Sequence, residues 1–187
     1  GEVLALGRNI EEAMNKAVRS LEIGVTGLDD MRFEGTTDAD LLDALMPARD
    51  DRLFMVAELL RRGVTPEAIH DRTQIDLFFL DKLLHIIEIE QALQANVGDI
   101  ETLELAKKNG FADRTVAGLW GKTEHEVKEL RDQNNLQPVY KMVDTVAAEF
   151  ESQTPYYYAT YEQENESLVS AKPSILVIGS GPIRIGQ

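Results

Sequence analysis

An internal repeat in the middle of the chain constrains the fold more than any other sequence feature. Gly63 and Gly110 lie 47 positions apart, and the same shift aligns three further apolar pairs: Ile69 with Val116, Leu80 with Val127, and Leu83 with Leu130. Each segment has the pattern of a helix, a glycine turn, a short helix, a second turn and a capped helix. The repeat therefore predicts two successive helix-turn-helix-like units.

Capping signals mark the helix boundaries across this region. Thr65 precedes Pro66 at a first helical position, and Thr123 with Glu126 forms a capping box. Residues 25–37 carry turn residues and little periodicity, whereas helical patterns follow from there to about Asn134. The sequence therefore predicts a mostly α-helical fold.

The longest predicted helix begins after Asp76 and runs to about Asn96. Its apolar residues spread over more than half of the circumference: Leu77, Phe79, Leu80, Leu83, Leu84, Ile86 and Ile87. A surface helix with one buried face does not need a stripe this wide. The helix is either the centre of a bundle, the commoner case, or it also buries a face against another chain. Phe78 is expected to point outward, away from a row of Leu77, Leu80 and Leu84.

Both ends of the chain carry patterns of α/β domains. Residues 1–7 have the pattern of a short apolar strand, followed by a helix that Asn9 caps. Residues 174–178 form an apolar run that ends in glycines, which is typical of a buried parallel strand entering a tight loop. Neither strand has a partner nearby, so we expect short α/β remnants and unburied apolar surface at 174–178.

Composition excludes several classes of function. The 187 residues are 43% hydrophobic, which is enough for a modest core, and the net charge of −14 repels phosphate backbones and anionic lipid. A DNA-binding helix-turn-helix module would need polar or basic residues where Asp76, Leu77 and Glu124 stand. The chain has no cysteine, no apolar run near the length of a bilayer and no apolar leader. We therefore expect no nucleic-acid partner, no membrane and a cytoplasmic location.

Residues that could carry chemistry are scarce in the helical region. His70, His85 and His125 lie on different elements without metal-ligand spacing, so we interpret them as helix-surface residues. Carboxylates interleaved with Lys107, Lys108 and Lys128 have the spacing of a solvated helix face. The sequence predicts no catalytic residue and no metal site.

Four tyrosines lie within six residues of the segment that follows the helices: Tyr156, Tyr157, Tyr158 and Tyr161. They could form a stacking platform for bases or sugars, but no basic residue stands among them. The favoured alternative is a connector whose aromatic rings attach it to the domains that it joins.

The glycine loop at the end of the chain nearly fits two phosphate motifs. Gly179, Gly181 and Gly186 are the candidate cofactor-binding residues, in an incomplete loop. Arg184 stands at the third glycine of a dinucleotide fingerprint, and Gln187 stands at the lysine of a Walker A loop. Neither motif is complete.

The same loop, Gly179-Ser180-Gly181-Pro182-Ile183-Arg184-Ile185-Gly186-Gln187, resembles the opening of each half of the carbamoyl-phosphate synthase large subunit. Further segments resemble that family in the same order along the chain: residues 1–8, 16–22, 107–113, 130–132, 138–141, 143–150, 154–156 and 160–162. Residues 24–48 carry no diagnostic motif.

The resemblance implies a domain division. Residues 1–25 would end the first, carboxyphosphate ATP-grasp half, and residues 26–150 would form the helical oligomerisation domain. Residues 151–172 would be a linker, and residues 173–187 would open the second, carbamoyl-phosphate half. The chain would then be the middle of a larger protein.

The resemblance also implies a function. The parent would be an ATP-dependent ligase of pyrimidine or arginine biosynthesis that makes carbamoyl phosphate from bicarbonate, glutamine-derived ammonia and ATP with magnesium or manganese. Its partners would be a second copy, the rest of the large subunit and a glutaminase small subunit. Because the family's ATP and metal ligands fall outside this chain, we expect a scaffold without cofactor or activity of its own. The alternative is a part in the ammonia path or in effector relay between the halves.

Overall fold

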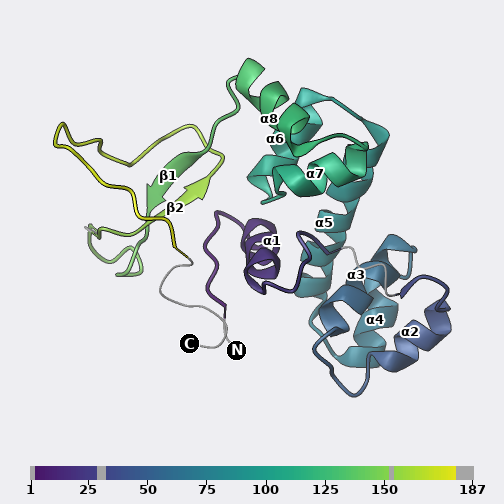
Figure 1. Ribbon diagram of the computed structural model, residues 1–187. Helices are drawn as coiled ribbons and strands as arrows, with labels where there is room; N and C mark the ends of the chain where they lie inside the picture. The colour runs from purple at the N-terminus through teal and green to yellow at the C-terminus, as the bar shows by residue number, and fades with distance from the viewer. Residues whose placement is uncertain (1–2, 29–32, 152–153, 180–187) are drawn as a thin grey trace.

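The computed structural model of the chain describes residues 3–28, 33–151 and 154–179. Within these ranges the fold is mostly α-helical, as predicted, with one two-stranded sheet (Figure 1). The helices are α1 (Ile10–Ser20), α2 (Asp38–Ala44), α3 (Arg52–Arg61), α4 (Pro66–Thr73), α5 (Leu77–Ala95), α6 (Ile100–Lys108), α7 (Asp113–Trp120) and α8 (Glu124–Gln133). The strands are β1 (Val139–Met142) and β2 (Tyr157–Thr160).

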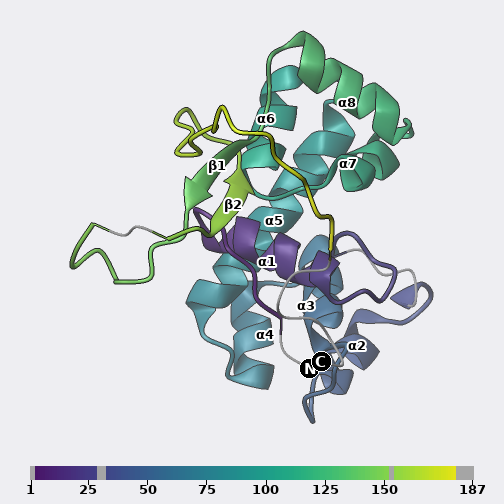
Figure 2. The ribbon, with the colours of Figure 1, turned by 60° about the vertical axis from the view of Figure 1, so that its left-hand side comes forward.

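Helix α5 is the centre of the structure. It contacts α1, α3, α4, α6 and α7, and it lies between the α2–α4 group and the α6–α8 group (Figures 1 and 2). Its buried residues occupy several sides of the helix: Leu80, Leu83, Ile86, Ile87, Ile89, Glu90 and Leu93. This arrangement confirms that the wide apolar stripe belongs mainly to the core of a bundle.

The predicted repeat is confirmed down to its turn hydrogen bonds. In the first unit, the Val64 N–H donates to the Leu59 carbonyl across 3.0 Å. In the second unit, the Phe111 N–H donates to the Ala106 carbonyl across 3.0 Å, which is the same bond shifted by the repeat. A glycine in the left-handed region, Gly63 (φ 88°) or Gly110 (φ 83°), closes each turn, as the Schellman motif requires.

The predicted capping residues stand at the starts of the helices. The side chains of Asn9, Thr65, Asp76 and Asp99 accept hydrogen bonds from backbone N–H groups of the first turn. Thr123 and Glu126 form the expected capping box. These bonds satisfy N–H groups that have no partner inside the helix.

The strands predicted at the two ends do not form in the described residues. Residues 3–8 and 174–178 have no ladder partner there, and a strand without a neighbour gains no ladder hydrogen bonds. The Leu6 carbonyl instead accepts a hydrogen bond from Lys16 Nζ. The side chains of residues 175–178 are 84–92% exposed, in line with the expected unburied apolar surface.

The sheet is a long-range pair that the sequence analysis did not identify. β1 and β2 are antiparallel, with Val139 opposite Thr160 and Met142 opposite Tyr157. Residue 166 covers the other edge of β1, because the Glu166 N–H donates to the Tyr140 carbonyl. The expected boundary between residues 150 and 151 falls in the connection between these paired strands, and that boundary stays a prediction.

The first turn of α5 exposes three large apolar side chains. Leu77, Phe78 and Phe79 are 41%, 50% and 51% exposed, and burial on α5 begins at Leu80. The outward position of Phe78 is confirmed. The placement of Leu77 in a core row is wrong, because this turn precedes the part of α5 that its neighbours cover.

The two repeat-related glycines allow a matched stability test. An alanine at either position must adopt a positive φ, which costs roughly 1–2 kcal/mol. At Gly110 the added Cβ would also lie 2.8 Å from the Glu12 carbonyl oxygen, whereas at Gly63 it would meet nothing within 4 Å. We expect Gly110→Ala to lower the free energy of unfolding by about 1–3 kcal/mol more than Gly63→Ala, since overpacking adds to the backbone cost. Urea denaturation measures both, and equal losses would contradict the close approach.

Candidate functional site

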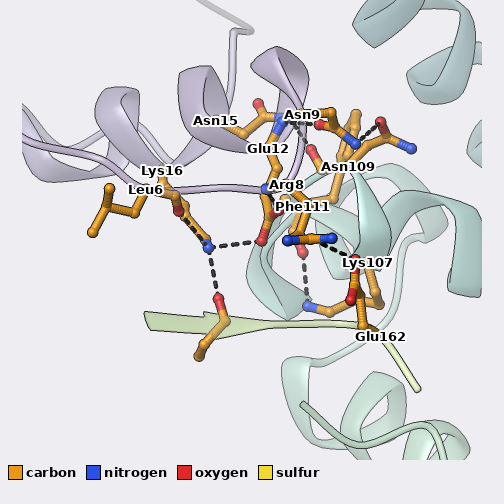
Figure 3. Close-up of polar contacts among 12 residues, drawn as sticks. Leu6, Arg8, Asn9, Glu12, Asn15, Lys16, Lys107, Asn109, Phe111 and Glu162 are labelled. Atoms are coloured by element: carbon orange, nitrogen blue, oxygen red, sulfur yellow. Dashed lines mark hydrogen bonds and ion pairs between the residues drawn. The ribbon is translucent and has the colours of Figure 1, made fainter. Parts of the chain in front are cut away.

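Three segments that are far apart in the sequence meet at one polar cluster, which we call the junction (Figure 3). The first is residues 6–19, from the extended segment into α1. The second comprises the turn between α6 and α7 with Arg131 of α8. The third is residues 159–162, at the end of β2.

Glu12 and Lys16 form the α1 side of the junction. The Glu12 carboxylate, on a residue only 1% exposed, accepts from the Arg8 N–H (2.6 Å) and from Lys16 Nζ (2.7 Å). Lys16 Nζ also donates to the Leu6 carbonyl (2.8 Å) and to the Ala159 carbonyl (2.6 Å). The three donors of one ammonium group thus connect α1 with the extended residues before it and with β2. Figure 3 shows Lys16 between α1 and β2.

The turn between α6 and α7 holds α1 from the other side. Asn15 Nδ2 donates to the Asn109 carbonyl (2.9 Å), and Asn9 Nδ2 donates to Asn109 Oδ1 (3.3 Å). The Arg19 guanidinium donates to the Gly110 carbonyl. Because Gly110 has no side chain, the turn can approach the α1 backbone closely enough for these bonds.

A buried ion network lies under the junction. Asp113 accepts from Lys107 Nζ (2.9 Å) and from the Arg131 guanidinium, whose Nε lies 2.9 Å from Asp113 Oδ1. The Lys107, Asp113 and Arg131 side chains are 7%, 13% and 9% exposed. Burial raises the pKa of the Asp113 carboxyl, but the Arg131 hydrogen bond and the Lys107 charge outweigh it and hold that pKa below its usual range.

The end of β2 packs onto this network. Lys107 Nζ lies 5.1 Å and Arg131 Cζ 5.9 Å from the centre of the Tyr161 ring, within the range of cation–π contacts. The next residue, Glu162, accepts from Arg8 Nε across 2.6 Å. Tyr158 stacks in the same way, 5.5 Å from Lys16 Nζ. These rings attach the connector to the helical region, as the favoured interpretation of the tyrosines expected, whereas Tyr156 and Tyr157 are exposed.

Sequence reasoning misplaced Lys107. It was expected on a solvated face with Lys108, but it is buried and donates to the Phe111 carbonyl as well as to Asp113. The repeat could have predicted this burial, because Lys107 is equivalent to Leu60, a core residue that is 3% exposed. Arg131 is likewise equivalent to the half-buried Leu84. The second unit therefore has charged groups where the first has apolar ones.

The histidines lie in three different settings. His125 is exposed beside Glu129, and half-buried His70 contacts the Ile75 carbonyl through Nδ1. His85 lies on the surface of α5, as expected, with its side chain 42% exposed, and its Nδ1 lies 2.8 Å from the buried Glu11 carboxylate. In the described ranges, no group of three or more His, Cys, Asp or Glu side chains could hold a metal ion.

Of the three candidate cofactor-binding glycines, only Gly179 lies in the described residues, where it is exposed. Gly181 and Gly186 lie outside them, so the phosphate loop stays a prediction. A hollow of about 440 Å³ beside Tyr161 is lined in part by Arg8 and Lys108. Glu162 and Glu164 also line it, so two carboxylates offset the two cations and the hollow does not resemble a phosphate site.

Two successive helix-turn-helix-like units, the first of which ends in the central helix α5, form a helical domain that is joined at one junction to the segments before and after it. Among the helices that the structure describes, none has the length and apolar character needed to cross a membrane.

The model of one protein family, the carbamoyl-phosphate synthetase large chain oligomerisation domain, matches residues 2–135. Because the match covers most of the chain, the protein belongs to this family, and the resemblance found in the sequence is confirmed. The matched region begins before α1 and ends after α8, so it contains α1 together with both repeat units.

The buried network predicts a pH-dependent loss of stability. Asp113 has a lowered pKa in the folded chain, so its contribution is present above the unfolded pKa, near 4, and is lost as the pH falls through the folded value. Asp113→Asn should lower the free energy of unfolding at pH 7 by about 3 kcal/mol, because two buried cations lose their carboxylate. The free energy of unfolding of this variant should also fall less steeply than that of the wild type as the pH is lowered from 7 to 3.

Glu104→Gln is the matched control for Asp113→Asn, because it breaks a Lys108 pair in which both side chains are about half exposed. Such pairs contribute about 0–1 kcal/mol. Urea denaturation from pH 3 to pH 7 compares the two variants. Similar small effects of both would show that the buried network contributes no more than a surface ion pair.

Proposed function

We propose that this chain is the scaffold and self-association domain of a carbamoyl-phosphate synthase large subunit. The family match supports the domain type. The observation that carries self-association is the first turn of α5, where Leu77, Phe78 and Phe79 are all 41–51% exposed. A run of large apolar side chains facing water is typical of an interaction surface.

A second copy of the chain is the proposed occupant of this turn. The Phe78 and Phe79 rings contact each other edge to face, with centroids 5.4 Å apart, and Lys82 Nζ lies 5.6 Å from the centre of the Phe78 ring. Two such turns would bury aromatic surface that each chain alone leaves in water. The net charge of −14 opposes the approach of two copies, so apolar contact has to supply the attraction.

The parent enzyme follows from the family as a further proposal. We propose that the large subunit makes carbamoyl phosphate in the cytoplasm from bicarbonate, glutamine-derived ammonia and ATP, with magnesium or manganese and a glutaminase small subunit. The quoted motifs and the family match support this reaction class. Of the two alternatives for this segment, the junction favours effector relay, because it connects residues on both sides of the helical region.

This chain alone should show no ATP turnover that depends on bicarbonate. Its described residues bring together buried ion pairs and backbone contacts whose groups already have partners, and the family's ATP ligands are expected elsewhere in the large subunit. Phosphate release with and without bicarbonate measures the activity, with a complete large subunit as the positive control. Bicarbonate-dependent release by the purified chain would overturn the proposal.

Phe78→Glu should weaken self-association while leaving the helices intact. Burying a carboxylate in an apolar contact is costly, so we expect at least about a tenfold loss of affinity, which corresponds to about 1.4 kcal/mol. Sedimentation velocity over a concentration series measures the association, and circular dichroism checks helicity.

Leu105→Glu provides the matched control for Phe78→Glu, because Leu105 is a 43% exposed leucine on the surface of α6. It should leave association unchanged. Monomers at every concentration for all proteins would contradict self-association. Equal association of wild type and Phe78→Glu would contradict Phe78 as the contact.

A further inference from the structure

Two segments that flank the helical region in the sequence, residues 3–9 before α1 and residues 157–162 around the end of β2, contact the same few side chains. Lys16 Nζ donates to a carbonyl in each, Leu6 at 2.8 Å and Ala159 at 2.6 Å. The two segments are also joined directly, because Arg8 Nε donates to Glu162 across 2.6 Å.

Both segments are fixed to the second helical unit as well. Asn9 is bonded to Asn109, and Tyr161 lies on the Lys107 and Arg131 cations. Lys107 and Asn109 are two residues apart at the end of α6. Each segment therefore contacts both the other segment and the same end of α6, which closes a loop of interactions.

We propose that these contacts form a clasp that makes residues 3–9 and 157–162 move as one body on the α6–α7 turn, with Lys16 and Tyr161 as its positioning residues. A displacement of one segment is then transmitted to the other without passing through the helical core. The coupling stands on contacts within this chain. Its use as a relay between the parts of a large subunit rests on the proposed function.

The geometry explains why the coupling is stiff. Lys16 is held in place by the 1% exposed Glu12, and Glu12 is fixed in turn by the Arg8 N–H. Lys107 and Arg131 are both anchored on Asp113. The groups that contact the moving segments are thus oriented by buried partners, and a well-oriented group loses little freedom when it forms its contact.

The clasp can be tested with spin labels, because the chain contains no cysteine and introduced cysteines are its only thiols. One label pair joins Leu4→Cys on the first segment to Leu105→Cys on α6, and a second joins Tyr157→Cys on β2 to Leu105→Cys. All three replaced side chains are exposed. Double electron–electron resonance on the full chain then measures the distance between the two labels of each pair. The width of that distance distribution reports how firmly the segment is held against the helical region.

Tyr161→Leu is the deciding variant, because the ring of Tyr161 contacts Lys107 and Arg131 of the second helical unit. It should broaden the distance distribution of the Tyr157 pair and also that of the Leu4 pair. Lys16→Met should broaden both as well. Tyr156→Leu replaces a tyrosine that is 64% exposed and should broaden neither.

A Leu4 distribution that stays narrow in Tyr161→Leu overturns the clasp, and so does a Tyr157 distribution that stays narrow. Circular dichroism confirms that each variant keeps its helices, and Lys16→Met remains as the second test if Tyr161→Leu does not fold. Measurements at concentrations where the chain is monomeric separate this result from self-association. The proposed function can therefore fail while the clasp holds, and the reverse.

Discussion

Burial of α5 is the constraint on which the rest of the structure depends. Its buried residues lie on several sides of the helix, so no single neighbour can remove them from water. The first unit covers α5 through α3 and α4, and the second through α6 and α7. Even its buried carboxylate is satisfied, because Glu90 accepts from Arg61 at 2.7 and 3.0 Å. Because α5 is the third helix of the first unit, loss of the second unit would expose the side of α5 that faces α6 and α7, which gives a physical reason for the second unit.

The two glycine turns show how one local structure serves two different attachments. The residue before each glycine holds a segment outside the repeat: Arg62 donates to the Phe33 and Thr36 carbonyls, whereas Asn109 contacts Asn9 and Asn15. Gly63 is required only for its positive φ, because a Cβ added there would meet no atom within 4 Å. Gly110 meets a second requirement, close approach to the α1 backbone. The second unit has thus become the attachment point for the segments around it.

Helix positions could be predicted from the sequence because caps and turns depend on residues within a few positions of each other. The Thr123–Glu126 capping box is such a local signal, and so are the glycines that end α3 and α6 at Gly63 and Gly110. The β1–β2 pair could not be predicted in this way, because residues 143–156 separate its strands and no short turn sets their register. Burial of Lys107 was missed because hydrophobic periodicity does not register a buried charge. Comparison with Leu60 across the repeat would have indicated it.

The distribution of charge connects the junction to the proposed interface. The chain has 19 basic residues against 33 acidic ones, and several of its cations are used at the junction: Arg8, Lys16, Arg19, Lys107 and Arg131. Each of them contacts a carboxylate or a carbonyl within the same chain. The buried charged residues of the described ranges are three acidic and three basic, so burial does not offset the net charge of −14, and two copies that meet through this surface would repel. Association then has to depend on apolar area, and the first turn of α5 exposes three large apolar side chains in succession.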